Sequence, residues 1–378
     1  MRKISADKVF TIENGIIENG VLILNEQNEI VSISTRDQFD SAELEILHGD
    51  ICPGFINAHC HLELSHLKNK ITPHNGLVNF IQQLIKARFE ISMEERLQQI
   101  ADAESEMIKN GIIAVGDISN EDISVHQKVK KNLYYHTFIE TIGLNPSIAQ
   151  IKFDEGLALS RKFFENELIN SLCPHAPYST STTLQQLIYN LHQTSTIHSQ
   201  ESDEESKFFK YKSGDFIEFY KNINIDISFF NSTNKNSIQN NINFFPTSSK
   251  ILFVHNTFMN ENDLNTMMNH NSNSFLCACI KANLFIESKV PDIQLWSKYS
   301  NNICIGTDSL ASNNCLSIWD EICSIQQYFP EITFNELLQY STLNGARFLG
   351  IDNWAGSFKI GKKPGVNLIV EDKIKRIV

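Results

Sequence analysis

The chain has 378 residues, of which 44 are acidic and 32 are basic, so its formal net charge is −12. This excess of negative charge argues against broad binding to nucleic acid or to an anionic membrane, and it favours a small-molecule substrate. No apolar run reaches the roughly 18 residues that a membrane span needs, and the first residues lack the apolar stretch of a secretory signal, so we expect a cytoplasmic protein. The 8 cysteines are scattered through apolar stretches, which indicates buried thiols in a reducing compartment.

Short alternating runs at the two ends of the chain predict a small β subdomain. Residues 8–12, 20–24 and 29–33 are rich in strand-forming side chains and are separated by turn sequences, which is typical of an antiparallel sheet. A similar run returns at 366–370, so we expect the two termini to pair. The expected boundaries are 1–52 and 356–378 for a β-sandwich subdomain and 53–355 for the catalytic domain.

Between these ends, apolar strands alternate with amphipathic stretches, which is the pattern of a parallel α/β architecture. Eight such units in about 300 residues predict a (β/α)₈ TIM-type barrel. The expected strands are 55–59, 112–118, 133–141, 169–175, 194–200, 251–255, 275–279 and 303–308. The expected helices are 77–88, 93–110, 181–192, 203–220, 261–270, 316–329 and 334–349. The polar segment 222–250 is expected to be an irregular surface loop without a role.

The motif His59-Cys60-His61 ends the first expected strand. In an extended backbone, residues two apart project to the same side, so His59 and His61 can reach one cation while Cys60 faces away. Such a pair is also common in polar loops. Taken alone, the motif leaves both a metal site and two unrelated histidines open.

Polar residues at the other strand ends decide between these alternatives, because the chemistry of a barrel sits at the carboxyl ends of its strands. Two neighbouring histidines, one remote histidine and one carboxylate would make a metal site with a position left for water. Considered alone, His255 is also consistent with a hydrogen-bonded histidine in the core, and Asp308 is consistent with a residue that caps a helix. Their joint occurrence at the same ends favours a functional site. The residues at these ends are His59, His61, His175, His198, His255 and Asp308.

Glu201 follows His198 by three residues in the segment His198-Ser-Gln-Glu201. A metal lowers the pKa of its bound water, but another group must accept the proton and deliver it to the leaving group. Glu201 is the candidate for that role. The alternative is a charge at a helix N-terminus, where the helix dipole favours a carboxylate.

Together these segments resemble the amidohydrolase superfamily, specifically its nucleobase and nucleoside deaminase branch, over nearly the whole chain. The resemblance implies one zinc or iron ion held by His59, His61, His198 and Asp308. It also implies Glu201 as proton shuttle, His255 and Asp308 as partners of the hydrolytic water, and His175 as a substrate contact. The segments that carry the resemblance are Pro53-Gly-Phe-Ile-Asn-Ala-His59-Cys-His61, His175-Ala-Pro-Tyr178-Ser, His198-Ser-Gln-Glu201, Val254-His255 and Gly306-Thr-Asp308-Ser309.

The residues at the end of the fourth expected strand indicate how many metal ions the site holds. Two-metal members of the superfamily bridge their ions there with a lysine or a glutamate, whereas this chain has Cys173-Pro-His175. A one-metal deaminase is therefore favoured.

Within that branch, His61-Leu-Glu63-Leu-Ser65 and residues 307–313 are similar to aminodeoxyfutalosine deaminases, which act on an adenine nucleoside in menaquinone synthesis. The chain departs from the branch in Cys279-Ile-Lys-Ala-Asn283, which lacks the usual proline and serine but keeps Asn283 as an expected substrate contact. We also expect Glu63 to bind a ribose hydroxyl and Arg88 to pair with a substrate carboxylate. The alternative for Arg88 is a cation favoured by a helix C-terminus.

The predicted reaction is hydrolytic deamination of an adenine-type nucleoside with release of ammonia. Other enzymes that keep such a site deaminate guanine or adenosylhomocysteine, remove chloride, or open a cyclic amide. A barrel that binds a metabolite without catalysis is a further alternative, although the intact set of candidate residues argues against it. A homodimer is left open as the assembly.

Overall fold

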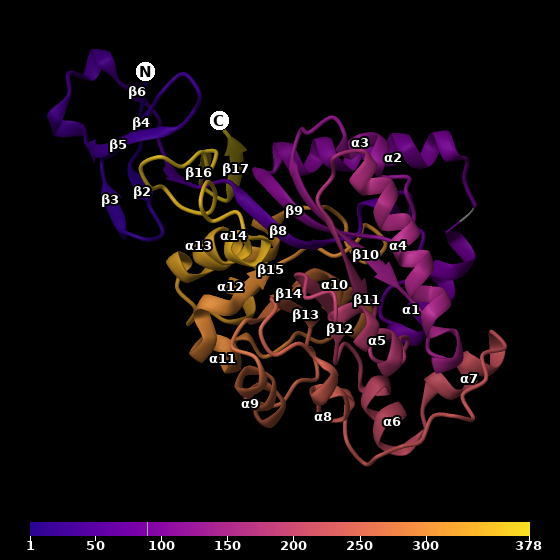
Figure 1. The fold of residues 1–378 in the computed structure, drawn as a ribbon. Helices are drawn as coiled ribbons and strands as arrows, with labels where there is room; N and C mark the ends of the chain where they lie inside the picture. Colours follow the sequence, from indigo (N-terminus) through magenta and orange to yellow (C-terminus); the bar gives the residue numbers. More distant parts are fainter. Residues whose placement is uncertain (89) are drawn as a thin grey trace.

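The computed structural model describes residues 1–88 and 90–378, whose strands form four sheets. Two sheets are parallel and lie in the middle of the chain, and the other two are built from strands near its ends (Figure 1). None of the described helices is both long enough and apolar enough to cross a membrane.

The two parallel sheets contain all eight strands predicted between residues 55 and 308. Their orders are β11-β10-β9-β8 and β12-β13-β14-β15. The last strand ends earlier than predicted, because Gly306 follows it and Asp308 adopts a left-handed backbone with φ 56°. The strands are β8 (Phe55–Cys60), β9 (Ile112–Ser119), β10 (Tyr134–Thr141), β11 (Asn170–Pro174), β12 (Ser195–Ser199), β13 (Ile251–His255), β14 (Ser274–Ala278) and β15 (Ile303–Ile305).

Backbone hydrogen bonds join the two parallel sheets at both edges. At one edge the N–H of His198 donates to the carbonyl of His175 at 2.9 Å, which links β12 to the end of β11. At the other edge the N–H of Thr307 donates to the carbonyl of His59 at 3.1 Å. The carboxyl ends of β8, β11, β12 and β15 therefore meet around a common point.

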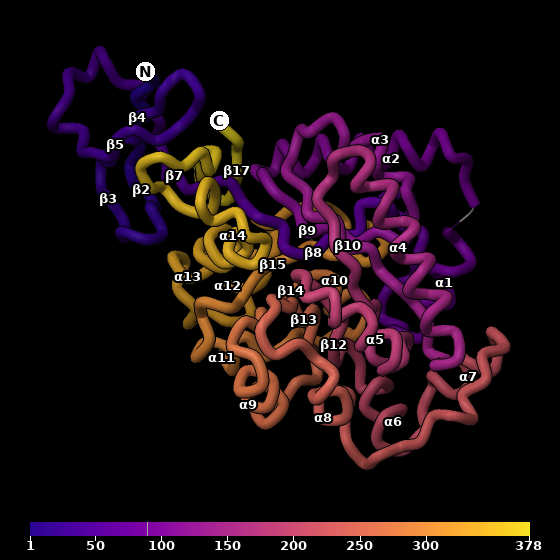
Figure 2. Tube along the Cα trace, in the orientation of Figure 1, coloured from indigo at the N-terminus to yellow at the C-terminus, as the bar shows by residue number. Residues whose placement is uncertain are grey.

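Helices follow most of these strands and cover the outside of the two sheets (Figures 1 and 2). The α-helices are α1 (Gly76–Ala87), α2 (Met93–Lys109), α3 (Val125–Lys128), α4 (Ala149–Glu165), α5 (Thr182–Tyr189), α6 (Asp203–Tyr211), α7 (Asp215–Asn222), α8 (Ser237–Asn241), α9 (Glu261–His270), α10 (Ile280–Glu287), α11 (Ile293–Trp296), α12 (Ile318–Tyr328), α13 (Phe334–Ser341) and α14 (Leu343–Leu349). Short 3₁₀ turns are η1 (Arg36–Gln38), η2 (Ser41–Glu43), η3 (Leu62–Leu67), η4 (Pro146–Ile148), η5 (Ile242–Phe244) and η6 (Ser297–Asn302).

The helix predictions need several corrections, and the short helices α3 and α11 were not predicted. The single helix expected at 203–220 is the pair α6 and α7, because the chain turns at Lys212 (φ 49°) and Gly214 (φ 89°). The helix expected at 334–349 is α13 and α14, which are separated by a non-helical Thr342. Helices α4 and α10 were not predicted, and the expected loop at 222–250 contains α8 and η5.

Strands from both ends of the chain share a sheet. In the order β17-β16-β7-β2-β3, strand β16 pairs antiparallel with β7, and Asn367 lies opposite Cys52. Figure 2 shows the two termini on the same side of the molecule. The strands of this sheet are β2 (Lys8–Phe10), β3 (Ile16–Glu18), β7 (Asp50–Cys52), β16 (Asn367–Val370) and β17 (Lys373–Arg376); the neighbouring sheet contains β1 (Arg2–Ser5), β4 (Gly20–Leu24), β5 (Ile30–Thr35) and β6 (Glu45–Ile46).

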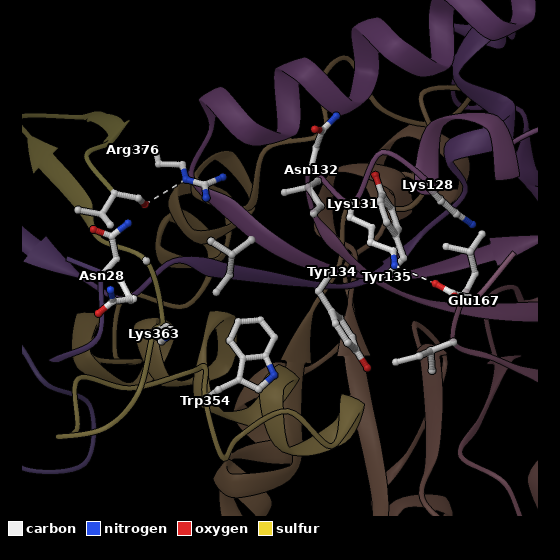
Figure 3. A pocket seen from close by; sticks show the side chains of 17 residues that line it. Asn28, Lys128, Lys131, Asn132, Tyr134, Tyr135, Glu167, Trp354, Lys363 and Arg376 are labelled. Atoms are coloured by element: carbon white, nitrogen blue, oxygen red, sulfur yellow. Dashed lines mark hydrogen bonds and ion pairs between the residues drawn. The ribbon is translucent and has the colours of Figure 1, made fainter. Parts of the chain in front are cut away.

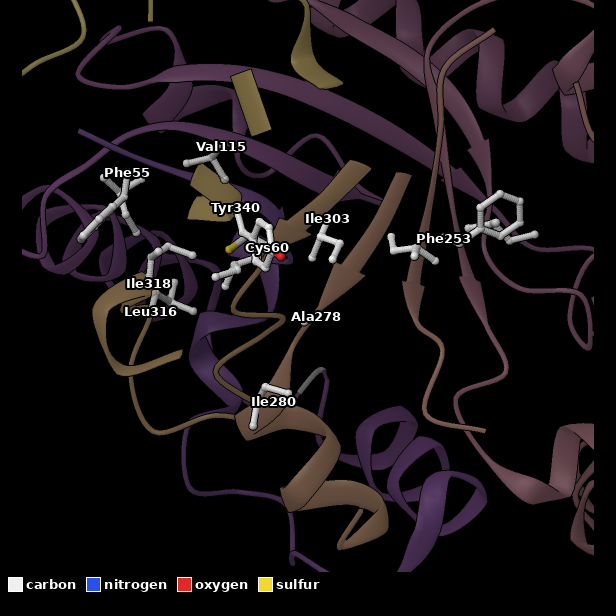
Figure 4. Packing of buried hydrophobic residues seen from close by; sticks show 14 of the residues in the cluster. Phe55, Cys60, Val115, Phe253, Ala278, Ile280, Ile303, Leu316, Ile318 and Tyr340 are labelled. Atoms are coloured by element: carbon white, nitrogen blue, oxygen red, sulfur yellow. The ribbon is translucent and has the colours of Figure 1, made fainter. Parts of the chain in front are cut away.

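A large apolar cluster fills the space between the parallel strands and the helices around them. Figure 4 shows part of it, including Phe55, Val115 and Ile303. Cys60 belongs to this cluster and is fully buried, so it packs into the core as predicted. Six of the eight cysteines are buried, whereas Cys323 is exposed.

Candidate active site

Five buried side chains converge where the strands end. His59 and His61 each place Nε2 3.5 Å from Oδ1 of Asp308, and the Nε2 atoms of His61 and His198 are 3.3 Å apart. Nitrogen and oxygen atoms of His59, His61 and His198, and of His59, His255 and Asp308, form two compact groups that could hold a metal ion. The structure thus brings together the residues that the sequence predicted as ligands.

The donor atoms in this cluster fit a divalent transition metal. Both ring nitrogens of His59 and Nδ1 of His61 are buried without a hydrogen-bond partner, which is costly unless another group satisfies them. Burial lowers the pKa of His61 to about 3 and holds the pKa of His198 well below its usual value. Neutral imidazole is the form that binds a metal, so the site favours a cation over protons.

Hydrogen bonds orient two of these histidines. His198 Nδ1 is 2.8 Å from the carbonyl of His175, so it carries the proton and leaves Nε2 for the cluster. His255 Nδ1 faces the side-chain amide of Asn283 at 3.3 Å. Because that amide donates, Nδ1 accepts and the proton of His255 lies on Nε2.

Glu201 lies beside the cluster with Oε1 3.5 Å from Nε2 of His255. Burial raises its pKa well above the usual value, and the nearby Asp308 carboxylate adds to the increase. A carboxyl group with a raised pKa is a stronger base than an ordinary carboxylate and can return the proton that it accepts, which suits general acid and base chemistry.

One cavity of about 710 Å³ is lined by His61, His198, His255, Glu201 and Asp308, whereas His59 is fully buried behind them. Its inner wall is polar and contains the cluster and His175, whose Nδ1 contacts the hydroxyl of Ser179. Its outer wall is largely apolar and comes from α1, α7 and the segment after α7. The loop expected to have no role therefore contributes Ile223, Asn224, Ile225 and Asp226 to the cavity.

The structure separates the four expected substrate contacts into two groups. His175 and Arg88 line the cavity. Glu63 and Asn283 lie behind its wall and do not line it, so direct contact with a substrate does not fit their positions. Glu63 accepts hydrogen bonds from Arg88 Nη2 at 2.8 Å and from the backbone of Asn120 at 3.0 Å, while burial raises its pKa to about 7.

The sequence analysis missed two acidic residues at strand ends. Glu140, near the end of β10, is buried and lines the cavity. Asp117, near the end of β9, accepts from the N–H of Leu62 at 2.8 Å, directly after His61. The strand-end rule that selected the histidines would also have found both residues.

A second cavity, of about 500 Å³, lies at the opposite, amino ends of β9 and β10 (Figure 3). Tyr134, Trp354, Lys363 and Arg376 line it. None of the metal-binding groups formed by the described residues lies there, so the first cavity is the candidate active site.

Comparison with known proteins identifies the family. A profile of the Amidohydrolase family matches residues 51–375. An adenosine deaminase of Helicobacter pylori is 27% identical over 326 residues, which cover 84% of this chain and 78% of that protein. An aminodeoxyfutalosine deaminase of Nitratiruptor sp. is also 27% identical, over 337 residues, with the same two coverages of 84% and 78%.

Solved structures share the fold. A Helicobacter pylori aminofutalosine deaminase in complex with methylthio-coformycin superimposes with a TM-score of 0.83 at 22% identity and covers 100% of both chains. An adenosine deaminase from Xanthomonas campestris with bound zinc gives a TM-score of 0.76 at 19% identity, covering 97% of this chain and 84% of the other.

Proposed function

Because the chain belongs to the amidohydrolase family, we propose that it is a metal-dependent hydrolase that removes the amino group of an adenine-type nucleoside as ammonia. The observation that carries the proposal is the convergence of His59, His61, His198 and Asp308 at the inner end of one cavity, which Glu201 also lines. The relatives named adenosine deaminase and aminodeoxyfutalosine deaminase support the same reaction class.

The cofactor is one divalent transition metal, zinc or iron. His59, His61 and His198 would supply nitrogen and Asp308 would supply oxygen, which is a donor set suited to these ions. When bound, the metal makes a water molecule acidic enough to attack at neutral pH.

Glu201 moves the proton in this proposal. The oxygen of water bonds to the ring carbon that carries the amine, and an Oε atom of Glu201 accepts the proton of that water. Glu201 then delivers this proton to the ring nitrogen beside the reacting carbon. It next takes the remaining proton from the added hydroxyl and passes it to the departing amine, so the C–N bond breaks, ammonia leaves and a carbonyl remains on the ring. His255 and Asp308 orient the water, and Asn283 holds His255 in the tautomer with a proton on Nε2.

The rest of the cavity wall is the proposed substrate site. His175 would contact the substrate near the reacting ring, and Arg88 would pair with a carboxylate where the substrate carries one. Glu63 holds Arg88 in place through their 2.8 Å hydrogen bond, so its effect on the substrate is indirect. The large apolar outer wall suits a nucleoside with a bulky group beyond its sugar.

The same proposal extends to the architecture. Residues 53–355 would form a closed (β/α)₈ barrel, and residues 1–52 and 356–378 a separate β-sandwich subdomain. The hydrogen bonds at both edges of the parallel sheets and the pairing of β16 with β7 support this division. A cytoplasmic location and a homodimer complete the proposal.

Ammonia release tests the function. The protein loaded with zinc or with ferrous iron is assayed with adenosine, aminodeoxyfutalosine, methylthioadenosine, adenosylhomocysteine and guanine, and with a chlorinated triazine and a cyclic amide. We expect ammonia from at least one adenine-type nucleoside, and aminodeoxyfutalosine is the first candidate. Ring opening or chloride release without any ammonia would contradict the proposal, and so would metal-loaded protein that is inert toward the whole panel.

A further inference from the structure

Glu140 lines the active-site cavity, and one of its two carboxylate oxygens has a hydrogen-bond partner while the other has none. Its side chain is buried, with 3% of its surface exposed. Asn120 Nδ2 donates to Oε2 at 3.0 Å, whereas Oε1 has no hydrogen-bond partner. A buried carboxylate oxygen without a donor is costly, so a bound ligand that supplies one would be favoured.

Oε1 of Glu140 does not serve to orient His198. Glu140 Oε1 is 3.6 Å from Nδ1 of His198, which is too long for a hydrogen bond. The same Nδ1 is 2.8 Å from the carbonyl of His175, and an imidazole nitrogen has only one proton to donate. His198 is therefore already oriented without Glu140.

A second metal ion does not account for it either. Glu140, His175 and His198 lie close enough to hold a cation, but His198 would have to use Nδ1, because its Nε2 faces His61 at 3.3 Å. That Nδ1 carries the proton given to the carbonyl of His175. The remaining partner for Oε1 is a donor on the substrate.

Glu140 lies across the ring of His198 from the predicted metal position, so it faces a part of the substrate away from the reacting carbon. An adenine-type nucleoside carries its remaining hydrogen-bond donors on the sugar. We propose that Glu140 is a specificity-determining residue that accepts a hydrogen bond from a sugar hydroxyl of the substrate. The inference rests on the proposed function and deepens it.

A chain of hydrogen bonds fixes Glu140 for this role. Asn120 clamps Oε2 through its side chain, and its backbone N–H donates to Glu63 at 3.0 Å. Glu63 in turn accepts from Arg88, so the two polar groups on this wall of the cavity, Glu140 and Arg88, share one support. Glu63, expected from the sequence to bind the sugar itself, thus acts through Asn120 and Arg88.

The test compares a ribonucleoside with its 2′-deoxy, 3′-deoxy and 2′,3′-dideoxy counterparts in the wild-type enzyme and in Glu140→Gln. The glutamine keeps the shape but presents a donor or a weaker acceptor to the cavity. We expect the variant to lose about 10- to 100-fold in kcat/KM on the ribonucleoside, chiefly through KM. Its kcat/KM on the dideoxy compound should stay within about 3-fold of wild type, so the preference for hydroxylated substrates collapses.

Two further variants separate contact from structure. Glu140→Asp keeps the charge but withdraws it by one methylene, and it should show the same loss in weaker form. Glu165→Gln, at the exposed end of α4, is the matched control and should keep the full preference. Metal content measured by elemental analysis should be equal in all four proteins.

An unchanged hydroxyl preference in Glu140→Gln and Glu140→Asp would overturn the inference, and so would a loss of metal in either variant. These results differ from failure of the proposed function, in which the wild-type enzyme itself would release no ammonia from any nucleoside.

Discussion

Several residues of the site have an unusual backbone. Gln200, His255 and Asp308, at or just after the ends of β12, β13 and β15, have φ values of 45°, 72° and 56°. Non-glycine residues rarely adopt this left-handed region, and such strain persists where surrounding contacts impose it. At Asp308 the N–H bonds to His59 and the carboxylate accepts from Ser312. These contacts aim the carboxylate at the histidines instead of along the strand.

Replacing Glu201 with glutamine should separate proton transfer from metal binding. Glu201→Gln removes the group that carries the proton but leaves His59, His61, His198 and Asp308 unchanged. We expect kcat to fall by about 10²- to 10⁴-fold while metal content stays the same. Steady-state ammonia release and elemental analysis measure the two quantities. Glu218→Gln, on the exposed side of α7, should change neither, and near-normal turnover of Glu201→Gln would remove Glu201 from the mechanism.

A buried carboxyl that does not line the active-site cavity should make stability depend on pH. Glu321 on α12 is fully buried, accepts from Asn313 Nδ2 at 3.0 Å, and has a pKa raised by burial to about 8. The folded protein therefore holds this proton more tightly than the unfolded chain, so stability falls as pH rises from about 4.5 to 8. The backbone N–H of Lys281 also donates to this carboxyl, which favours the charged form and lowers the pKa. The effect of burial is larger, so the pKa stays raised.

Denaturant unfolding at several pH values tests this dependence. Glu321→Gln should lose less stability than wild type across the window, by up to about 1.4 kcal/mol per pH unit. The exposed Glu331→Gln should follow the wild-type curve. Parallel curves for wild type and Glu321→Gln would show that Glu321 ionises without cost.

The sequence predicted that His59, His61, His198 and Asp308 would lie together, because the positions of strand-end side chains follow from a two-residue period and from strand polarity. It did not locate Glu63 and Asn283 correctly relative to the cavity. Both lie in helices that begin just after a strand, η3 and α10, and the direction of each side chain depends on a partner distant in sequence, such as Arg88 or Thr257. Glu140 was missed although it lies near the end of a predicted strand, because its partner Asn120 belongs to the preceding loop and nothing in the sequence shows that the two side chains meet.

At the scale of elements, a buried ion pair supports the turn that follows His61. Asp117 on β9 accepts from the N–H of Leu62 at the start of η3 and pairs with Lys128 on α3. Both side chains are buried, and Lys128 Nζ also donates to Thr137 at 2.9 Å. The pair therefore ties the second strand and its helix to the backbone that carries His61.

Removing the cation of this pair should destabilise the fold. Lys128→Met leaves the Asp117 carboxylate buried without its counter-ion, and we expect a loss of about 3–5 kcal/mol in the free energy of unfolding. Lys131→Met is the matched control, because Lys131 and Glu167 form an exposed pair, with side chains 65% and 85% exposed, worth under about 1 kcal/mol. Urea unfolding compares the two variants. Equal losses of unfolding free energy in the two variants would mean that the buried pair stabilises the fold no more than the exposed pair does.

The element predictions were accurate for strands and weaker for helices. Buried parallel strands are continuous apolar runs, which the sequence displays directly. The division of 203–220 into α6 and α7 depends on the left-handed backbone of Lys212 and on Gly214. These two residues break the helix without interrupting the apolar pattern around them, so the sequence is consistent with one helix. Helix α4 was missed although it has 17 residues, because only Ala149, Gly156 and Phe163 on it are buried and its apolar stripe is narrow.

At the scale of the whole molecule, the site joins the two parallel sheets. His59 belongs to the first sheet and His198 to the second, while Asp308 follows the last strand and bonds back to the first. An ion held by all three would connect β8, β12 and the segment after β15, which are far apart in the sequence. Metal binding should therefore stabilise the fold as a whole.

Metal removal should lower the melting temperature, and the effect should depend on the ligand set. Ligand at 100 times its Kd stabilises a protein by about 2.7 kcal/mol, so zinc in excess should raise Tm by several degrees over chelated protein. Differential scanning fluorimetry with a chelator, followed by added zinc, measures this shift. The melting temperature of His61→Ala should be close to that of the chelated wild type. Neither the chelator nor added zinc should change it, because the remaining ligands bind zinc too weakly. His126→Ala removes an exposed histidine on α3 and should respond as wild type does. A full zinc response in His61→Ala would mean that the stabilising ion binds elsewhere and that the cluster at the strand ends is not its site.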